Sequence, residues 1–501
     1  MNITKSQIGI GNVVNPFLNA IKAEQNVGVT ENGAKSNASS LNSCVDFFAA
    51  AAAIRQQPAN VVIELFNKAF AQNRDVALKI LFYIRDVREG QGERKTFRII
   101  LQHLANNYPD IVAKNINNIS FFGRWDDLYI LADTKSEDIA FKTIALQLKT
   151  DAENVLTGKP VSLLAKWLKS VNTSSEESRR LGHKTAAYLG LSPKNYRKAI
   201  AFLRNHINVI ETKLCAKKFS DIDYEKVPSK ASLLYRKAFN KRDGDRYRAY
   251  LGSVEKGEAK MNASVVYPYE IIRPIETYTT SDETELKTLD LAWKNQPDWL
   301  KDNPHKGIVV ADTSGSMSGM PILVSLSLAI YFAERNTGPF KDHFITFSST
   351  PVLQYIPGTT IFEKVRNLNR TGWGMNTNLK SVFNLILLTA VKHKIKPEDM
   401  VDYIYIISDM QFDSCCDNSS TNFELIKQNY AVLGYKMPKL VFWNVKATPG
   451  DSPVTINDTG TALVSGCSPS ILKSILSAKQ FNPADVMLET INNARYACVS
   501  A

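Results

Sequence analysis

Apolar residues recur at helical spacing through most of the first half of the chain. Three windows place their apolar positions on one face of a helix; they cover residues 61–70, 76–84 and 97–104. Pro58, Pro109 and Pro193 stand where helices are expected to begin, because proline is tolerated in the first turn. Strand-like alternation is scarce in this part. The pattern predicts a HEAT-like α-solenoid of stacked helices over residues 44–300, ending in a proline-containing connector and preceded by a polar, flexible arm at residues 1–43.

After residue 300 the pattern changes to strands that alternate with helices. Short apolar runs predict strands at residues 308–311, 343–347, 351–355, 403–408, 440–445 and 462–464. Helical patterns lie between and after them, at residues 321–334, 379–392, 423–430, 468–476 and 484–497. Alternation of this length predicts a doubly wound, mostly parallel α/β domain over residues 301–501.

The first of these strands runs into three oxygen-bearing side chains at alternate positions, Asp312, Ser314 and Ser316. Alternate side chains of an extended segment point the same way, so the three are expected to converge. The carboxyl end of a buried parallel strand is also where open α/β sheets bind ligands. One carboxylate with two hydroxyls suits a hard divalent cation, Mg²⁺ or Mn²⁺, and not zinc or copper. The alternative is that both serines cap the following helix.

The run Asp-Thr-Ser-Gly-Ser at residues 312–316 resembles the Asp-x-Ser-x-Ser signature of von Willebrand factor A domains. In that family the metal-ion-dependent adhesion site (MIDAS) binds a divalent cation. The resemblance implies two further ligands, Thr377 at the start of a helical pattern and Asp409 directly after the strand at 403–408. It also implies that the metal can capture an acidic residue of a partner protein.

The chain of 501 residues has a net charge of +12, and the position of this charge matters more than its size. Residues 179–260 contain 20 Lys and Arg against 8 Asp and Glu, so this stretch carries the whole excess. A local basic field of this kind indicates a polyanionic partner, most commonly nucleic acid. The alternative is a solvated helix face on which lysines are simply frequent.

Aromatic residues stand beside basic ones at Gly123-Arg124-Trp125-Asp126-Asp127-Leu128 and at Leu164-Ala165-Lys166-Trp167. Such pairs can stack bases and hold phosphates, or they can be core tryptophans with snorkelling lysines. A helical region with these segments, followed by an A domain, resembles the TROVE architecture of Ro autoantigen proteins. The resemblance implies a ring of HEAT-like repeats closed by the A domain, which binds single-stranded ends of misfolded RNAs and small structured RNAs without catalysis. The residues predicted to bind RNA are Arg124, Lys166, His183, Lys184, Lys194, Arg197, Lys198, Arg204, His206, Arg236, Lys237, Lys241 and Arg242.

Two alternatives to RNA binding remain open at this point. The chain could be a protein-interaction module in which the metal at Asp312 captures an acidic partner residue and the basic charge is incidental. It could also be a metal-dependent nuclease, since Asp413 and Asp417 follow Asp409 closely. No catalytic triad, zinc spacing or phosphate loop is recognisable in the sequence, which predicts a protein that is not an enzyme. Six scattered cysteines predict free thiols in the reducing cytoplasm, and no apolar run is long enough to predict a membrane span.

Overall fold

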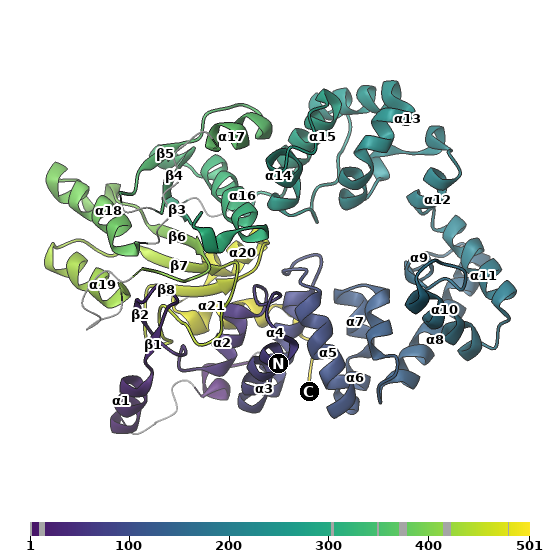
Figure 1. Cartoon of the computed structure of the whole chain (residues 1–501), viewed down its shortest axis with the longest axis horizontal. Helices are drawn as coiled ribbons and strands as arrows, with labels where there is room; N and C mark the ends of the chain where they lie inside the picture. The colour runs from purple at the N-terminus through teal and green to yellow at the C-terminus, as the bar shows by residue number, and fades with distance from the viewer. Residues whose placement is uncertain are drawn as a thin grey trace.

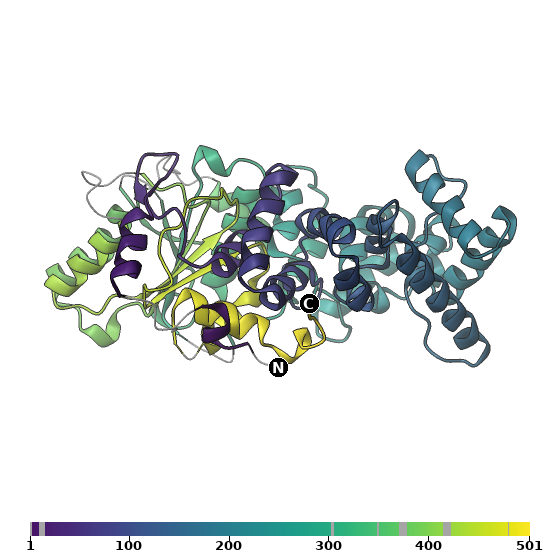
Figure 2. The same ribbon diagram turned by 90° about the horizontal axis from the view of Figure 1, so that it is seen from below.

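A computed structural model of the chain describes residues 3–9, 16–301, 305–347, 350–369, 378–413, 422–478 and 480–501. Helices dominate the part before residue 300, and a six-stranded sheet with helices around it forms the part after it (Figure 1). The view turned by 90° shows the two parts side by side along the longest axis of the molecule (Figure 2). This order confirms the predicted helical region followed by an α/β region.

Fifteen helices are described before residue 300. They are α1 (Pro16–Gln25), α2 (Ser43–Ala50), α3 (Ala59–Gln72), α4 (Arg74–Arg85), α5 (Lys95–Asn107), α6 (Pro109–Lys114), α7 (Ile116–Phe122), α8 (Glu137–Leu156), α9 (Leu164–Trp167), α10 (Glu176–Tyr188), α11 (Pro193–His206), α12 (Ile210–Cys215), α13 (Ser229–Glu255), α14 (Pro268–Glu276) and α15 (Glu283–Lys294), and the 3-10 helix η2 (Trp125–Leu131) precedes α8. In the described parts of the chain, none of the helices combines the length and the apolar content that a membrane-spanning segment requires.

Local sequence signals set where several of these helices begin. The side chain of Asn73 accepts the N–H of Val76 at the start of α4. Ser192 accepts the N–H of Asn195 at the start of α11, where Pro193 occupies the first turn. The three apolar windows predicted from periodicity fall within α3, α4 and α5, and their apolar sides are largely buried. Amphipathic periodicity therefore located these helices correctly.

The sheet has the strand order β5-β4-β3-β6-β7-β8. Its strands are β3 (Gly307–Ala311), β4 (His343–Thr346), β5 (Leu353–Tyr355), β6 (Tyr403–Ser408), β7 (Lys439–Asn444) and β8 (Thr461–Ser465). Among the described strand pairs of this sheet, β4 and β5 run antiparallel and all the others run parallel. The accompanying helices are α16 (Met320–Arg335), α17 (Ile361–Leu368), α18 (Leu379–His393), α19 (Asn422–Val432), α20 (Leu472–Ser477) and α21 (Pro483–Ile491). The predicted mostly parallel sheet is confirmed.

The middle of the sheet contains the point at which the strand order reverses. From β3 the chain proceeds to β4 on one side, and it later returns to β6 on the other side. In open α/β sheets, ligands bind at the carboxyl edge beside such a switch point. Ala311 of β3 pairs with Ile407 of β6, so the residues that follow these two strands leave the same edge of the sheet side by side.

The helical part forms an arc that is attached to the α/β part at both ends (Figure 1). At one end α2 and α4 contact β8 and α21, and Arg495 donates to Asp86 over 2.8 Å. At the other end α14 and α15 contact α16 and α17, and the indole N–H of Trp293 donates to Glu334 over 2.6 Å. The chain thus returns to the sheet after traversing the arc.

Part of the segment predicted as a flexible arm is bound to the α/β part. Strands β1 (Gly28–Val29) and β2 (Lys35–Ser36) form a hairpin beside the loop that follows β6. The Thr30 hydroxyl donates to the carbonyl of Phe412 over 2.7 Å, and backbone hydrogen bonds join Asn37 to Ser452. Polar composition suggested a loose segment, but its backbone and side-chain donors find partners more than 370 residues away.

Candidate functional site

The sheet places two aspartates together at its carboxyl edge. All five residues of β3 and all six of β6 are buried, and Asp312 and Asp409 directly follow these neighbouring strands. The backbone N–H of Asp312 still donates to Ile407 over 3.0 Å, which continues the strand pairing by one residue. The exposed fractions of Asp312 and Asp409 are 0% and 2%. Two carboxyl groups are therefore held in a desolvated position at the switch point.

Hydroxyl groups surround the Asp312 carboxylate. Its Oδ1 accepts the backbone N–H of Ser314 over 2.9 Å, and its Oδ2 accepts the Ser408 hydroxyl over 2.6 Å. The hydroxyl oxygens of Ser314 and Ser316 are 3.0 Å apart. Adjacent ligands of an octahedral Mg²⁺, each about 2.1 Å from the ion, are separated by about 3.0 Å. The spacing of the two serine hydroxyls fits a shared hard cation as well as it fits a direct hydrogen bond.

Negative charge accumulates around this edge of the sheet. Burial raises the pKa of Asp312, and the charge of Asp409 raises it further, while hydrogen bonds from Ser408 and Ser314 act in the opposite direction. Burial also raises the pKa of Asp451 to about 6, with smaller contributions from Asp409 and from Glu31 of the hairpin. A cation at this position would relieve the repulsion among the acidic groups.

The structure describes four of the five predicted metal ligands. Asp312, Ser314, Ser316 and Asp409 lie at one edge of the sheet, whereas Thr377 lies outside the described residues. Ser408 was missed, although its position directly before Asp409 at a strand end could have indicated it. Among the described residues, no group of three or more His, Cys, Asp or Glu is placed to hold a metal ion, so a cation here would depend on the hydroxyls.

The nuclease hypothesis rests on two further acids, Asp413 and Asp417, which follow Asp409 in the sequence. Asp413 forms a backbone bridge with Gly33 of the hairpin, and Asp417 lies outside the described residues.

Five of the thirteen residues predicted to bind RNA are engaged inside the protein. Arg204 donates to the carbonyls of Ala165 and Leu168, and Arg236 is buried and donates to Leu233. The remaining three are paired with acids: Arg124 with Asp126, Lys166 with Glu211, and Lys184 with Asp133 and Glu137. These contacts occupy the five side chains, which leaves the other eight residues as the candidates for a free basic surface.

The exposed side of α11 carries a group of basic residues without acidic partners among the described residues. Lys194, Arg197, Lys198 and His206 are exposed, and none of them makes an ion pair within the described residues. Phe202 lies among them with 58% of its surface exposed. We call these five residues the α11 surface. Phe202 was missed by sequence reasoning, because an apolar residue in an amphipathic helix is normally assigned to the core.

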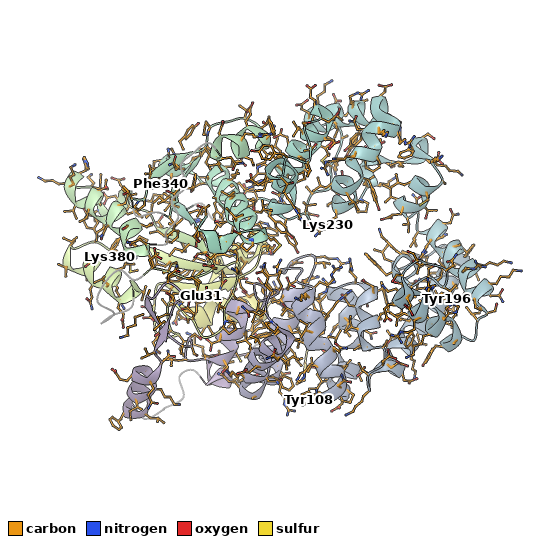
Figure 3. The ribbon with its side chains drawn as sticks, viewed as in Figure 1. Glu31, Tyr108, Tyr196, Lys230, Phe340 and Lys380 are labelled. Carbon is orange, nitrogen blue, oxygen red and sulfur yellow. The ribbon has the colours of Figure 1, made fainter. Side chains whose placement is uncertain are left out.

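Two other helices carry the remaining exposed residues of the RNA-binding prediction. His183 is exposed on α10, which packs against α11. Lys237, Lys241 and Arg242 are exposed on α13, although Lys237 donates to the carbonyl of Thr279. Figure 3 shows Tyr196 of α11 and Lys230 of α13 on the helical part, away from Glu31 beside the sheet. The basic surfaces and the oxygen-rich site therefore lie in different parts of the molecule.

The motif Gly123-Arg124-Trp125-Asp126-Asp127-Leu128 forms an ion-pair network. Asp127 accepts from Arg85 over 2.7 Å, from Arg98 over 2.7 Å and from the backbone N–H of Arg124 over 3.0 Å. A side chain at Gly123 would collide with the Asp127 carboxylate, which explains the glycine. The guanidinium of Arg124 lies over the ring of Trp167 at 4.1 Å, so the two aromatic–basic segments noted in the sequence meet in space.

Comparison with known proteins gives matches along nearly the whole chain. Residues 30–138 and 142–304 match the family model described as a domain of unknown function, DUF2828, and residues 306–496 match another such domain, DUF7788. An uncharacterised protein of Acanthamoeba polyphaga mimivirus is 31% identical over an alignment 503 residues long. The alignment covers 93% of this chain and 87% of that protein. The crystal structure of the Deinococcus radiodurans RO (RSR) protein matches with 13% identity and a TM-score of 0.35, covering 87% of this chain and 91% of that one.

Proposed function

The chain belongs to the DUF2828 family, and we propose that it is a Ro-type RNA-binding protein without catalytic activity. Its ligands are single-stranded RNA ends or small structured RNAs, and the α11 surface is their principal contact. The observation that carries the proposal is the group of four unpaired basic side chains around exposed Phe202. This group belongs to the stretch that holds the entire charge excess of the chain.

The chemistry of the α11 surface suits a nucleic acid strand. Lys194, Arg197 and Lys198 can neutralise successive phosphates, because no carboxylate among the described residues already occupies them. An exposed phenylalanine provides a face on which an unpaired base stacks, and such stacking contributes about 1 to 3 kcal/mol per base. In the proposed arrangement the helical arc is a HEAT-like ring that the α/β part closes, with RNA bound along it.

The test of this function is a binding titration with a fluorescent single-stranded RNA, using the wild-type chain and Phe202→Ala. Wild type is expected to bind, and Phe202→Ala is expected to bind about tenfold more weakly because one base loses its stacking partner. Since Phe202 is largely exposed, its loss should leave the unfolding temperature unchanged.

Phe202→Tyr provides the matched control, because it retains an aromatic face and should bind RNA as wild type does. Leu388→Ala on α18, a similarly exposed apolar residue away from the basic stretch, should also have no effect. Absence of RNA binding by the wild-type chain would contradict the proposal and would favour the protein-interaction alternative.

The α/β part is proposed to be a von Willebrand A-type domain that holds Mg²⁺ or Mn²⁺. Asp312, Ser314, Ser316 and Asp409 would hold the ion, and their all-oxygen character fits it. Bound there, the ion supplies positive charge that binds one further anionic oxygen. The protein's own contribution is to hold the two carboxyl groups and the hydroxyls at one edge of the sheet.

Asp312→Asn is expected to abolish stabilisation by divalent metal while preserving the shape of the side chain. Wild type at a Mn²⁺ concentration of 100 times its Kd should gain about 2.7 kcal/mol of unfolding free energy. The variant should gain almost none, which thermal unfolding with and without chelator measures. Asp110→Asn changes an exposed residue of α6, away from the sheet; it is the control and should respond as wild type does. Equal metal responses of wild type and Asp312→Asn would contradict the assignment.

A further inference from the structure

Four arginines at the ends of three elements of the helical part gather around two aspartates. Arg85 ends α4, Arg94 and Arg98 lie at the start of α5, and Arg124 precedes η2. The aspartates are Asp126 and Asp127, both in η2. We call these six residues the arginine cluster; with all six ionised, its formal charge is +2. The cluster lies on helices other than α11 and is distinct from the α11 surface.

Three of the four guanidinium groups form ion pairs with the carboxylates of Asp126 and Asp127. Arg85 pairs with Asp127, and both are buried. Arg98 spans the two acids, since its Nε donates to Asp127 over 2.7 Å and its Nη2 to Asp126 over 2.9 Å. Arg124 donates two parallel hydrogen bonds to Asp126, at 2.9 and 2.7 Å. The carboxylates are thus saturated by partners that also fix their positions.

Arg94 is the surplus cation of the arginine cluster. It is exposed and makes no ion pair within the described residues. Partial burial lowers its pKa, and repulsion from Arg124, Arg98 and Arg85 lowers it further, with only Asp126 acting in the opposite direction. The adjacent acid Glu93 is already engaged, because it pairs with Arg55 over 3.0 Å and accepts the N–H of Lys95.

The neighbouring residues hold the cluster in place before any ligand arrives. Arg124 is pressed against the Trp167 ring at 4.1 Å, and Lys166 beside that ring is paired with Glu211. Arg94 and Arg98 are one helical turn apart on the same side of α5, so their side chains can converge on one group. The guanidinium groups of Arg98 and Arg124 are already oriented by the aspartates, so these two lose little freedom when they bind an oxyanion.

We propose that Arg94, together with Arg98 and Arg124, binds a phosphate group. A phosphate monoester or inorganic phosphate carries close to two negative charges at neutral pH, which matches the surplus of the cluster. Its oxygens accept charge-assisted hydrogen bonds from guanidinium forks. The phosphate can come from the terminus of an RNA or from free phosphate, and both would be held by the same chemistry. This inference goes beyond the proposed function, because it requires no RNA.

The experiment measures thermal unfolding in inorganic phosphate against chloride of equal ionic strength. Phosphate should raise the unfolding temperature of wild type, whereas Arg94→Gln should lose most of that rise. In chloride alone, Arg94→Gln should unfold at the same or a higher temperature than wild type, because the substitution removes a repelled charge. Arg197→Gln on the α11 surface should keep the full phosphate response. Equal phosphate responses of wild type and Arg94→Gln would overturn the proposal.

A second arm distinguishes the sources of the phosphate, using RNA with a 5′-phosphate, a 3′-phosphate or hydroxyl ends only. If the cluster holds an RNA terminus, one phosphorylated RNA should bind several-fold more tightly to wild type and lose this advantage in Arg94→Gln. If it holds free phosphate, all three RNAs should bind alike while the phosphate response persists. A chain that binds no RNA but shows the Arg94-dependent phosphate response would disprove the proposed function and leave this inference standing.

Discussion

Asp127→Ala is expected to lower the free energy of unfolding of the helical part by about 3 to 5 kcal/mol. The substitution leaves Arg85 without its carboxylate, and Arg85 is only 2% exposed. An unpaired guanidinium in that position cannot recover its hydration, so the energy of burying the charge is no longer offset. Arg98 and the backbone N–H of Arg124 lose the same acceptor. Denaturant unfolding followed by far-UV circular dichroism, with attention to the helical transition, measures the effect.

Two further variants separate a lost ion pair from a general loss of packing. Asp126→Ala should destabilise the protein less, because its partners Arg98 and Arg124 are partly exposed and can be hydrated. The double change Arg85→Met with Asp127→Leu should recover much of the lost stability, since it removes both buried charges. An Asp127→Ala variant as stable as wild type would show that the network does not hold these helices together.

Reversing two charges on the α11 surface, Arg197→Glu with Lys198→Glu, is expected to weaken single-stranded RNA binding by on the order of 100-fold or more. Each charge-assisted contact contributes about 1.5 to 3 kcal/mol, and 1.4 kcal/mol corresponds to a factor of ten. Losing two phosphate contacts should also flatten the slope of log affinity against log salt by about 1.4. Fluorescence anisotropy titrations at several salt concentrations measure both quantities.

The matched control applies the same change of net charge elsewhere. Lys427→Glu with Lys473→Glu reverses two exposed lysines on α19 and α20 of the α/β part and should change RNA affinity little. Arg236 is unsuitable for charge reversal because it is buried, and its substitution would test folding. If both double variants lost affinity equally, the net charge of the chain and not the α11 surface would account for RNA binding.

The hydrophobic patterns located helices and strands, but they did not show which strands pair with each other. Helical periodicity placed residues 61–70, 76–84 and 97–104 correctly within α3, α4 and α5, because an amphipathic helix encodes its own buried face. Apolar runs likewise identified the strands of the sheet. The strand order and the register that joins Ala311 to Ile407 were not readable, because they depend on contacts between distant segments. The hairpin at residues 28–36 was missed for the same reason.

The position of the positive charge along the chain and the residues that follow the buried strands could be read from the sequence, since both depend on local composition and spacing. Which basic side chains are free depends instead on contacts between distant parts of the chain. Lys166 and Lys184 look available in the sequence, yet Glu211 and Asp133, each at least 45 residues away, neutralise them. Arg98 is likewise paired with Asp126 and Asp127, which lie 28 and 29 residues away, whereas Arg94, four residues before it, has no acidic partner among the described residues. An ion pair depends on distance in space, and the sequence specifies only distance along the chain.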